Sequence, residues 1–135
     1  MRDDEVDDGT PRAALDAAGR GVGAFAHRSG PGFGRSGDGV AEVYGCLGEL
    51  SYLVGALPQV LHTLMSAVRA QQELGGLTVP GAPQGADVSA TVEAVSVAVE
   101  LGMQAAYRLR EQVDAAHELV AGLGQVRPDA GSAGE

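Results

Sequence analysis

The sequence predicts an all-α fold: an antiparallel hairpin of two long helices that dimerises into a four-helix bundle, with disordered termini. Three observations predict it. Aliphatic side chains recur at alternating spacings of three and four residues in two long stretches, and a connection rich in glycine and proline separates these stretches. Aromatic residues make up only 4% of the chain, which is too few for a thick globular core. A repeat of 3.5 residues is typical of one helix packed lengthwise on another.

The first long helix is predicted over 38–74. Asp38 is a suitable N-cap, and Gly75 and Gly76 end the run. Pro58 lies in the middle, where its missing N–H and its ring cost about 3 kcal/mol in a regular helix. Because the spacing passes Pro58 without a change of phase, we expect one kinked helix, with two separate helices as the alternative. The core-type positions, all but one aliphatic, are Val40, Val43, Leu47, Leu50, Val54, Leu57, Leu61, Leu64, Val68 and Gln71.

A turn over 75–87 and a second helix over 88–123 complete the predicted hairpin, which therefore covers 38–124. Pro80, Gly81 and Pro83 preclude a helix in the turn, and either Asp87 or Ser89 caps the second helix. Many core-type positions of this helix are small, so leucines of the first helix can sit over them. These positions are Val88, Val92, Val95, Val99, Gly102, Ala106, Leu109, Val113, Ala116, Val120 and Leu123.

Both ends of the chain are predicted to be disordered. Residues 1–37 and 125–135 are dominated by Gly, Ala, Arg and Asp and bury too little apolar surface to offset the entropy of ordering them. Within the N-terminal arm, Thr10 as N-cap and Pro11 at the first helical position predict a short helix over 10–18, which Gly19 stops.

The apolar stripe of the first helix is wider than a single partner helix covers. A further row of Cys46, Leu53, Val60 and Ala67 flanks the alternating series. This excess predicts self-association or binding to another helical protein. The interaction face is predicted to comprise Leu47, Leu50, Val54, Leu57, Leu61, Leu64 and Val68.

The charge distribution excludes some partners. The net charge is −9, the chain has no lysine, and residues 38–124 carry ten acids against three bases, so the hairpin repels phosphate and is not expected to bind nucleic acid. Four arginines in the N-terminal arm are interpreted as a solvated linker, with contact to nucleic acid or an acidic partner as the alternative: Arg12, Arg20, Arg28 and Arg35.

The sequence also bears on location. A single cysteine, Cys46, rules out an internal disulfide and fits a reducing compartment. No apolar stretch follows the first residues, so no signal peptide is recognised and we expect a cytoplasmic protein. Residues 50–68 carry no formal charge, but polar residues recur on one side. This pattern favours a helix with one solvent-exposed face over a membrane span.

No catalytic, metal or cofactor site is predicted. Residues 32–37 match the letters G-x-G-x-x-G, but a dinucleotide site needs a preceding strand, and none is indicated. Counting residues outward from the turn places Cys46 and His117 at similar distances along the hairpin, where a histidine could activate a thiol. Cys46 lies in an apolar row, however, and is interpreted as a small hydrophobic residue. By the same count His62 lies near Glu100. His27, His62 and His117 are too far apart to bind zinc together.

One motif carries a resemblance. Tyr107-Arg108-Leu109-Arg110-Glu111 contains Tyr-x3-Glu, which resembles the export signal of small leaderless secreted hairpin proteins of actinobacteria, the Trp-x-Gly class. Length, two-helix architecture and composition are similar to that class, although the turn reads Gly75-Gly76-Leu77 and the chain has no tryptophan. The run from Ala41 to Leu61 also resembles uncharacterised small helical proteins of actinobacteria, a group that implies no function.

We therefore interpret the chain as a non-enzymatic protein–protein interaction module without cofactors, whose partner is itself or another helical protein. The alternative, which the Trp-x-Gly resemblance implies, is a leaderless substrate or partner of a specialised actinobacterial secretion system. A third hypothesis is peripheral attachment to a membrane through the same apolar face, which the acidic surface opposes on anionic lipid.

Overall fold

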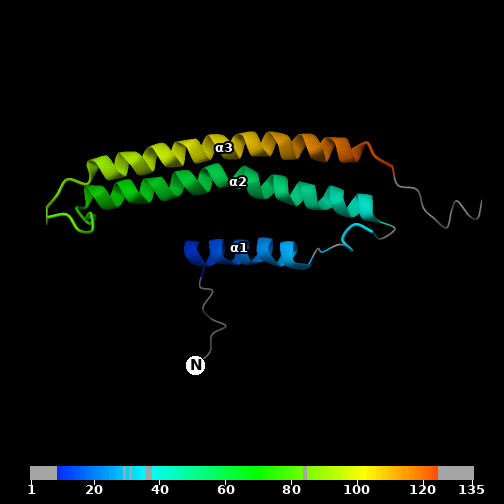
Figure 1. Cartoon of the computed structure of the whole chain (residues 1–135), viewed down its shortest axis with the longest axis horizontal. Coiled ribbons are helices and arrows are strands. Elements are labelled where there is room, and N and C mark those ends of the chain that lie inside the picture. The colour runs from blue at the N-terminus through cyan, green and yellow to red at the C-terminus, as the bar shows by residue number, and fades with distance from the viewer. Residues whose placement is uncertain (1–8, 29, 31, 36–37, 84, 125–135) are drawn as a thin grey trace, which may run out of the picture. The chain divides into compact units, whose positions relative to one another are not determined.

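The computed structural model describes residues 9–28, 30, 32–35, 38–83 and 85–124. Over these residues the protein is all-helical and has no strand; its helices are α1 (Pro11–Arg28), α2 (Gly39–Glu73) and α3 (Ser89–Ala121) (Figure 1). The predicted all-helical class is confirmed; the third helix, α1, lies where a short helix was expected over 10–18 and is longer than expected. The chain divides into two units, one containing α1 and one containing α2 and α3. The expected disorder of 1–8 and 125–135 falls outside the described residues.

Helix α1 starts where the sequence predicted and ends later. The Thr10 hydroxyl accepts a hydrogen bond from the Ala13 N–H at 3.1 Å, and Pro11 follows as the first helical residue. The expected stop at Gly19 was wrong, because the helix continues to Arg28. A glycine ends a helix when it turns left-handed, and Gly19 does not have a positive φ. The i,i+4 ion pair between Asp16 and Arg20, at 2.7 Å, spans this position.

Helix α2 is one continuous helix with Pro58 inside it, so the alternative of two separate helices was wrong. The kink expected at Pro58 stays a prediction. The C-terminus of α2 has the left-handed glycine that α1 lacks at Gly19. Gly75 has a φ of 73°, its N–H bonds the Gln72 carbonyl at 3.0 Å, and the Gly76 N–H bonds the Gln71 carbonyl at 2.9 Å. These two bonds satisfy carbonyl groups that the helix end leaves open.

Helix α3 follows a turn in which Gly81 and Gly85 have positive φ. The residue before the helix is Val88, which has no side-chain capping role. Instead the Asp87 carboxylate accepts a hydrogen bond from the Ser89 N–H at 2.9 Å. This bond, together with one from the Ser89 side chain, lowers the pKa of Asp87 below its ordinary value of 3.8.

Helices α2 and α3 lie side by side and antiparallel (Figure 1). The contacts that join them follow one register: the residue numbers of each contacting pair add up to between 161 and 165. Tyr44 and His117 mark one end of this series, and Gln72 and Ser89 mark the other, next to the turn. Such a constant register requires two rods in contact along most of their length.

The core between α2 and α3 is thin. Among the described residues its buried hydrophobic side chains are small or flexible, and none is completely buried. They are Val54, Met65, Val92, Ala106 and Val113. Two helices present only one line of contact to each other, so most of their apolar surface stays in water.

Candidate interaction face

The α2 side chains that face α3 form two rows at seven-residue spacing. One row contains Leu47, Val54, Leu61 and Val68; the other contains Ser51, Pro58, Met65 and Gln72; every member is buried or half-buried. The Ser51 hydroxyl donates a hydrogen bond to the Asp114 carboxylate, and the Gln72 amide donates one to the Ser89 hydroxyl at 3.5 Å. We call the line of contact between these two rows and α3 the seam. Polar groups take part in the seam, but its centre is apolar.

The seven residues of the predicted interaction face separate into two groups. Four lie in the seam with α3: Leu47, Val54, Leu61 and Val68. The other three form a row beside it, where Leu50 is 42% exposed, Leu64 is 48% exposed, and Leu57 between them is half-buried. The structure therefore brings the two groups to different surfaces of α2, one covered by α3 and one open.

Sequence reasoning missed the second row of the seam. Ser51, Pro58, Met65 and Gln72 continue the same alternation of three and four when they are combined with the Leu47 row. Periodicity alone cannot choose between this row and the Leu50 row, because both lie next to the Leu47 row on a helix. The available signal was the hydrogen-bonding capacity of Ser51 and Gln72, which find partners across the pair.

On α3, too, one of the two rows that contact the other helix is not a predicted row. The α3 side of the seam combines the predicted apolar row of Val92, Val99, Ala106 and Val113 with a row in which three of four residues are polar, Ser96, Met103, Arg110 and His117. The Arg69 guanidinium donates a hydrogen bond to the Ser96 hydroxyl at 3.1 Å. Of the other predicted positions within α3, Val95 and Leu109 are exposed, whereas Gly102 and Ala116 are half-buried, and Gly102 lies against Leu61. Both helices therefore turn their more polar flank toward each other and leave a more apolar flank open.

Glycines on α2 make room for the large polar side chains of α3. A Cβ atom built on Gly48 would lie 3.4 Å from the Nε2 atom of His117, and one built on Gly55 would lie 2.7 Å from the Cζ atom of Arg110. The His117 ring also stacks on Tyr44, with 4.1 Å between ring centroids. Without side chains at these two glycines, Arg110 and His117 can lie across the backbone of α2.

The open rows of both helices fall on one side of the α2–α3 pair. Each is displaced from its seam in the same rotational sense, and in an antiparallel pair this brings both rows to a common side. We name this surface the apolar face. It contains Cys46, Leu50, Leu53, Leu57, Val60 and Leu64 from α2, and Val95, Ala98, Ala105, Leu109, Gln112 and Ala116 from α3. Each of these residues is exposed or half-buried.

No residue of the apolar face is Asp, Glu, Lys, Arg or His, although residues 38–124 carry ten acids and three bases. The ionisable groups lie on the other surfaces, where Arg110 pairs with Asp114 at 3.7 Å. An apolar surface of this kind, bordered by polar ones, is typical of a site that binds another macromolecule.

The candidate chemical groups do not converge. His117 lies against Tyr44 and Gly48, which flank Cys46 in the sequence, so His117 and Cys46 lie at similar distances from the turn, as expected, but the ring of His117 contacts Tyr44 and Gly48. Cys46 is a free, half-buried thiol. In the part of the chain that the structure describes, no group of three or more His, Cys, Asp or Glu residues could hold a metal ion.

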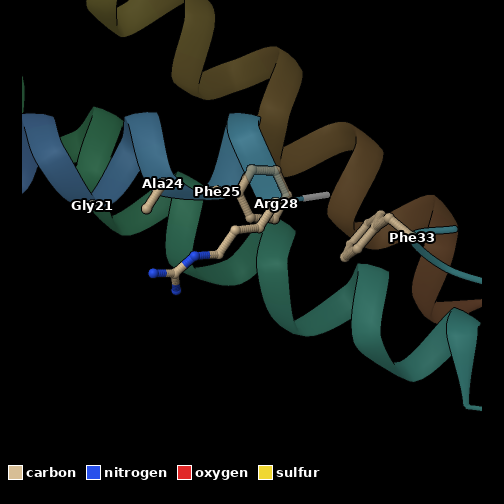
Figure 2. Close-up of a pocket in the computed structure, with 5 residues that line it drawn as sticks. All are labelled: Gly21, Ala24, Phe25, Arg28 and Phe33. Atoms are coloured by element: carbon tan, nitrogen blue, oxygen red, sulfur yellow. The ribbon is translucent and has the colours of Figure 1, made fainter. Parts of the chain in front are cut away.

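A separate hollow of about 470 Å³ lies at the C-terminal end of α1. Figure 2 shows its lining residues, in which the Phe25 and Phe33 rings meet edge to face with 5.4 Å between centroids. The Arg28 side chain extends along α1, away from Phe33 (Figure 2). The hollow is open to solvent and its walls are exposed, so it lacks the enclosed, converging polar groups of a ligand site.

Helix α2 is long and apolar enough, by length and composition, to cross a membrane. α3 lies along α2 and carries Glu93, Glu100, Arg110, Glu111 and Asp114, and ionised groups are costly in the hydrocarbon layer. The polar bond between Ser51 and Asp114 lies at one end of this charged segment. The geometry therefore favours covering of the apolar flank by protein.

Comparison of the chain with protein-family models, curated proteins and solved structures finds no match.

Proposed function

We propose that this chain is a non-enzymatic protein–protein interaction module, in which the hairpin of α2 and α3 binds another helical polypeptide through the apolar face. The resemblance to actinobacterial helical proteins and the cytoplasmic location remain predictions. The hairpin supplies a long, uncharged surface along two helices, and long apolar strips of this kind bind helices through leucine anchors at three- and four-residue spacing.

The observation that carries the proposal is the exposure of Leu50 and Leu64, at 42% and 48%, in a surface without charge. Each leucine side chain contributes about 1.5–3 kcal/mol when it moves from water into an apolar environment. Several such side chains at regular spacing therefore supply a binding free energy that offsets the cost of association.

The thin core supports the same proposal. Val54 is 3% exposed, but no side chain of the described residues is completely buried. A pair of helices with so little interior is only marginally stable, and a partner on the apolar face adds the burial that the pair lacks.

A photo-crosslinking experiment tests the proposal without knowledge of the partner. Benzoylphenylalanine is placed at position 64, inside the apolar face, or at position 52, where Tyr52 is 78% exposed on the other side of α2. In cells that make the full chain, position 64 should yield a discrete protein adduct and position 52 should not. The proposal is wrong if position 64 yields none, or if both positions yield the same adducts.

A second candidate is the leaderless substrate or partner of a specialised secretion system. Its support is that Tyr107 is 57% exposed and that Glu111, one turn further along α3, is also exposed, so a receptor can read both side chains. Tyr107→Ala should then abolish appearance of the protein in the culture filtrate, while Tyr52→Ala should leave it unchanged. Equal export of both variants contradicts this candidate.

A further inference from the structure

We infer that the polypeptide that covers the apolar face is a second copy of this chain, and that α2 of each copy packs on α3 of the other. The inference rests on the proposed function of the apolar face and names its partner. The resulting bundle has four helices, and each is antiparallel to both of its neighbours.

The two halves of the apolar face differ in side-chain size. The α2 half is built mostly of large residues, with Leu50, Leu57 and Leu64 in the row beside the seam. The α3 half contains small residues at Ala98 and Ala105. A two-fold axis places the large half of one copy on the small half of the other, and the reverse contact follows by symmetry. An arrangement of α2 on α2 would set leucines against leucines and leave the small residues unfilled.

The register of the contact follows from the register inside one copy. A two-fold axis parallel to the helices leaves the height of every residue along the bundle unchanged. The contacts between α2 and the second copy's α3 therefore repeat the pairing in which residue numbers add up to about 163, as they do within one copy. Leu57 then meets Ala105 of the second copy, and Leu64 meets Ala98 of the second copy. Small residues at those positions let the helix backbones approach closely.

Charge favours a copy of this chain over a basic partner. A basic partner would bind where acidic groups face it. Residues 38–124 carry ten acids, but none of them lies on the apolar face. A second acidic hairpin is tolerated because its charges lie outside the contact, where solvent and salt screen them. An uncharged, size-complementary surface thus fits a second copy.

Disulfide trapping between two separately made full-length chains tests the inference. Both chains carry Cys46→Ser; a tagged chain carries Leu57→Cys and an untagged chain carries Ala105→Cys. Mild oxidation should give about tenfold more tagged–untagged product than a control pair with Tyr52→Cys and Leu101→Cys, because a disulfide needs closely spaced Cα atoms. The control positions are 78% and 59% exposed, so they are reactive in any loose encounter.

A second pair, Leu64→Cys with Ala98→Cys, repeats the test if the first pair disturbs folding, which circular dichroism reports. Light scattering on the unmodified chain should give twice the chain mass of 13.6 kDa. A single copy at all concentrations, or preferential trapping of Leu57→Cys with itself, overturns the inference. If light scattering shows a single copy while position 64 crosslinks to a different protein, the inference is wrong and the proposed function stands.

Discussion

The guanidinium group of Arg110 lies over Gly55, so close that a Cβ atom built on that glycine would lie 2.7 Å from the Arg110 Cζ atom. The contact joins the middle of α2 to the C-terminal half of α3. It places an arginine in the seam of a pair whose other central positions are apolar, and it depends on the absence of a side chain at position 55.

This contact predicts a coupling between the two residues. Gly45→Ala, at a helical glycine with open space around it, should raise the free energy of unfolding by about 1 kcal/mol through helix propensity alone. Gly55→Ala should gain less, because the arginine must move away. In an Arg110→Ala background Gly55→Ala should recover the full gain, as a double-mutant cycle by urea denaturation measures. Equal gains of Gly55→Ala in both backgrounds would show that the contact carries no energy.

The seam and the open surface should respond differently to truncation. Val54→Ala removes buried carbon in the seam and should lower the free energy of unfolding by about 1–2 kcal/mol. Leu101→Ala removes more carbon, but that side chain is 59% exposed and lies outside both the seam and the apolar face, so the loss should stay within about 0.5 kcal/mol. Thermal unfolding followed by circular dichroism gives the comparison. A larger loss for Leu101→Ala than for Val54→Ala would contradict the assignment of the seam.

Asp87 should titrate below the ordinary value of an aspartate. Hydrogen bonds from the Ser89 backbone and side chain favour its charged form, so the pKa in the folded state is lowered. Since a lowered pKa stabilises the folded state above the unfolded pKa, this contribution is complete at neutral pH and is lost as the pH falls through the folded pKa. An NMR titration of the Asp87 carboxyl carbon measures the midpoint. Ser89→Ala should raise it, and an unchanged midpoint in that variant would contradict the assigned cause.

Self-association of this acidic chain should strengthen with salt. Two hairpins of like charge repel, and the Debye length shortens from about 10 Å at 0.1 M salt to about 3 Å at 1 M. The dissociation constant from sedimentation should therefore fall as salt rises. Glu49→Gln, next to the apolar face on α2, should reduce this salt dependence more than Glu118→Gln, which lies on the polar side of α3. A dissociation constant that rises with salt would indicate contacts between opposite charges and argue against a second copy.

Much of the local structure could be predicted from short-range features. Thr10 and Pro11 mark the start of α1, and the glycines at 75 and 76 follow the end of α2. The end of α1 could not be predicted from Gly19, because the same residue type ends a helix only when its φ becomes positive, and that depends on the residues that follow.

The sequence predicted that α2 has an apolar stripe, but it did not predict which residues of that stripe stay exposed. Leu50 and Leu61 belong to the same alternating series, yet one is exposed and the other packs against Gly102, where a Cβ atom would lie 3.3 Å from a Leu61 methyl group. The series contains more apolar rows than one partner helix covers, so its spacing leaves the choice of rows open.

The sequence by itself determined that the chain is helical, where the long helices lie, and that the first carries more apolar rows than one partner helix covers, because periodicity, capping residues and composition are local properties. Only the tertiary structure decided which rows of α2 meet α3. That choice depends on side-chain size and hydrogen bonding between residues far apart in the chain: Gly48 and Gly55 admit His117 and Arg110, and Ser51 meets Asp114. The leucines left outside that contact form the open face as a consequence.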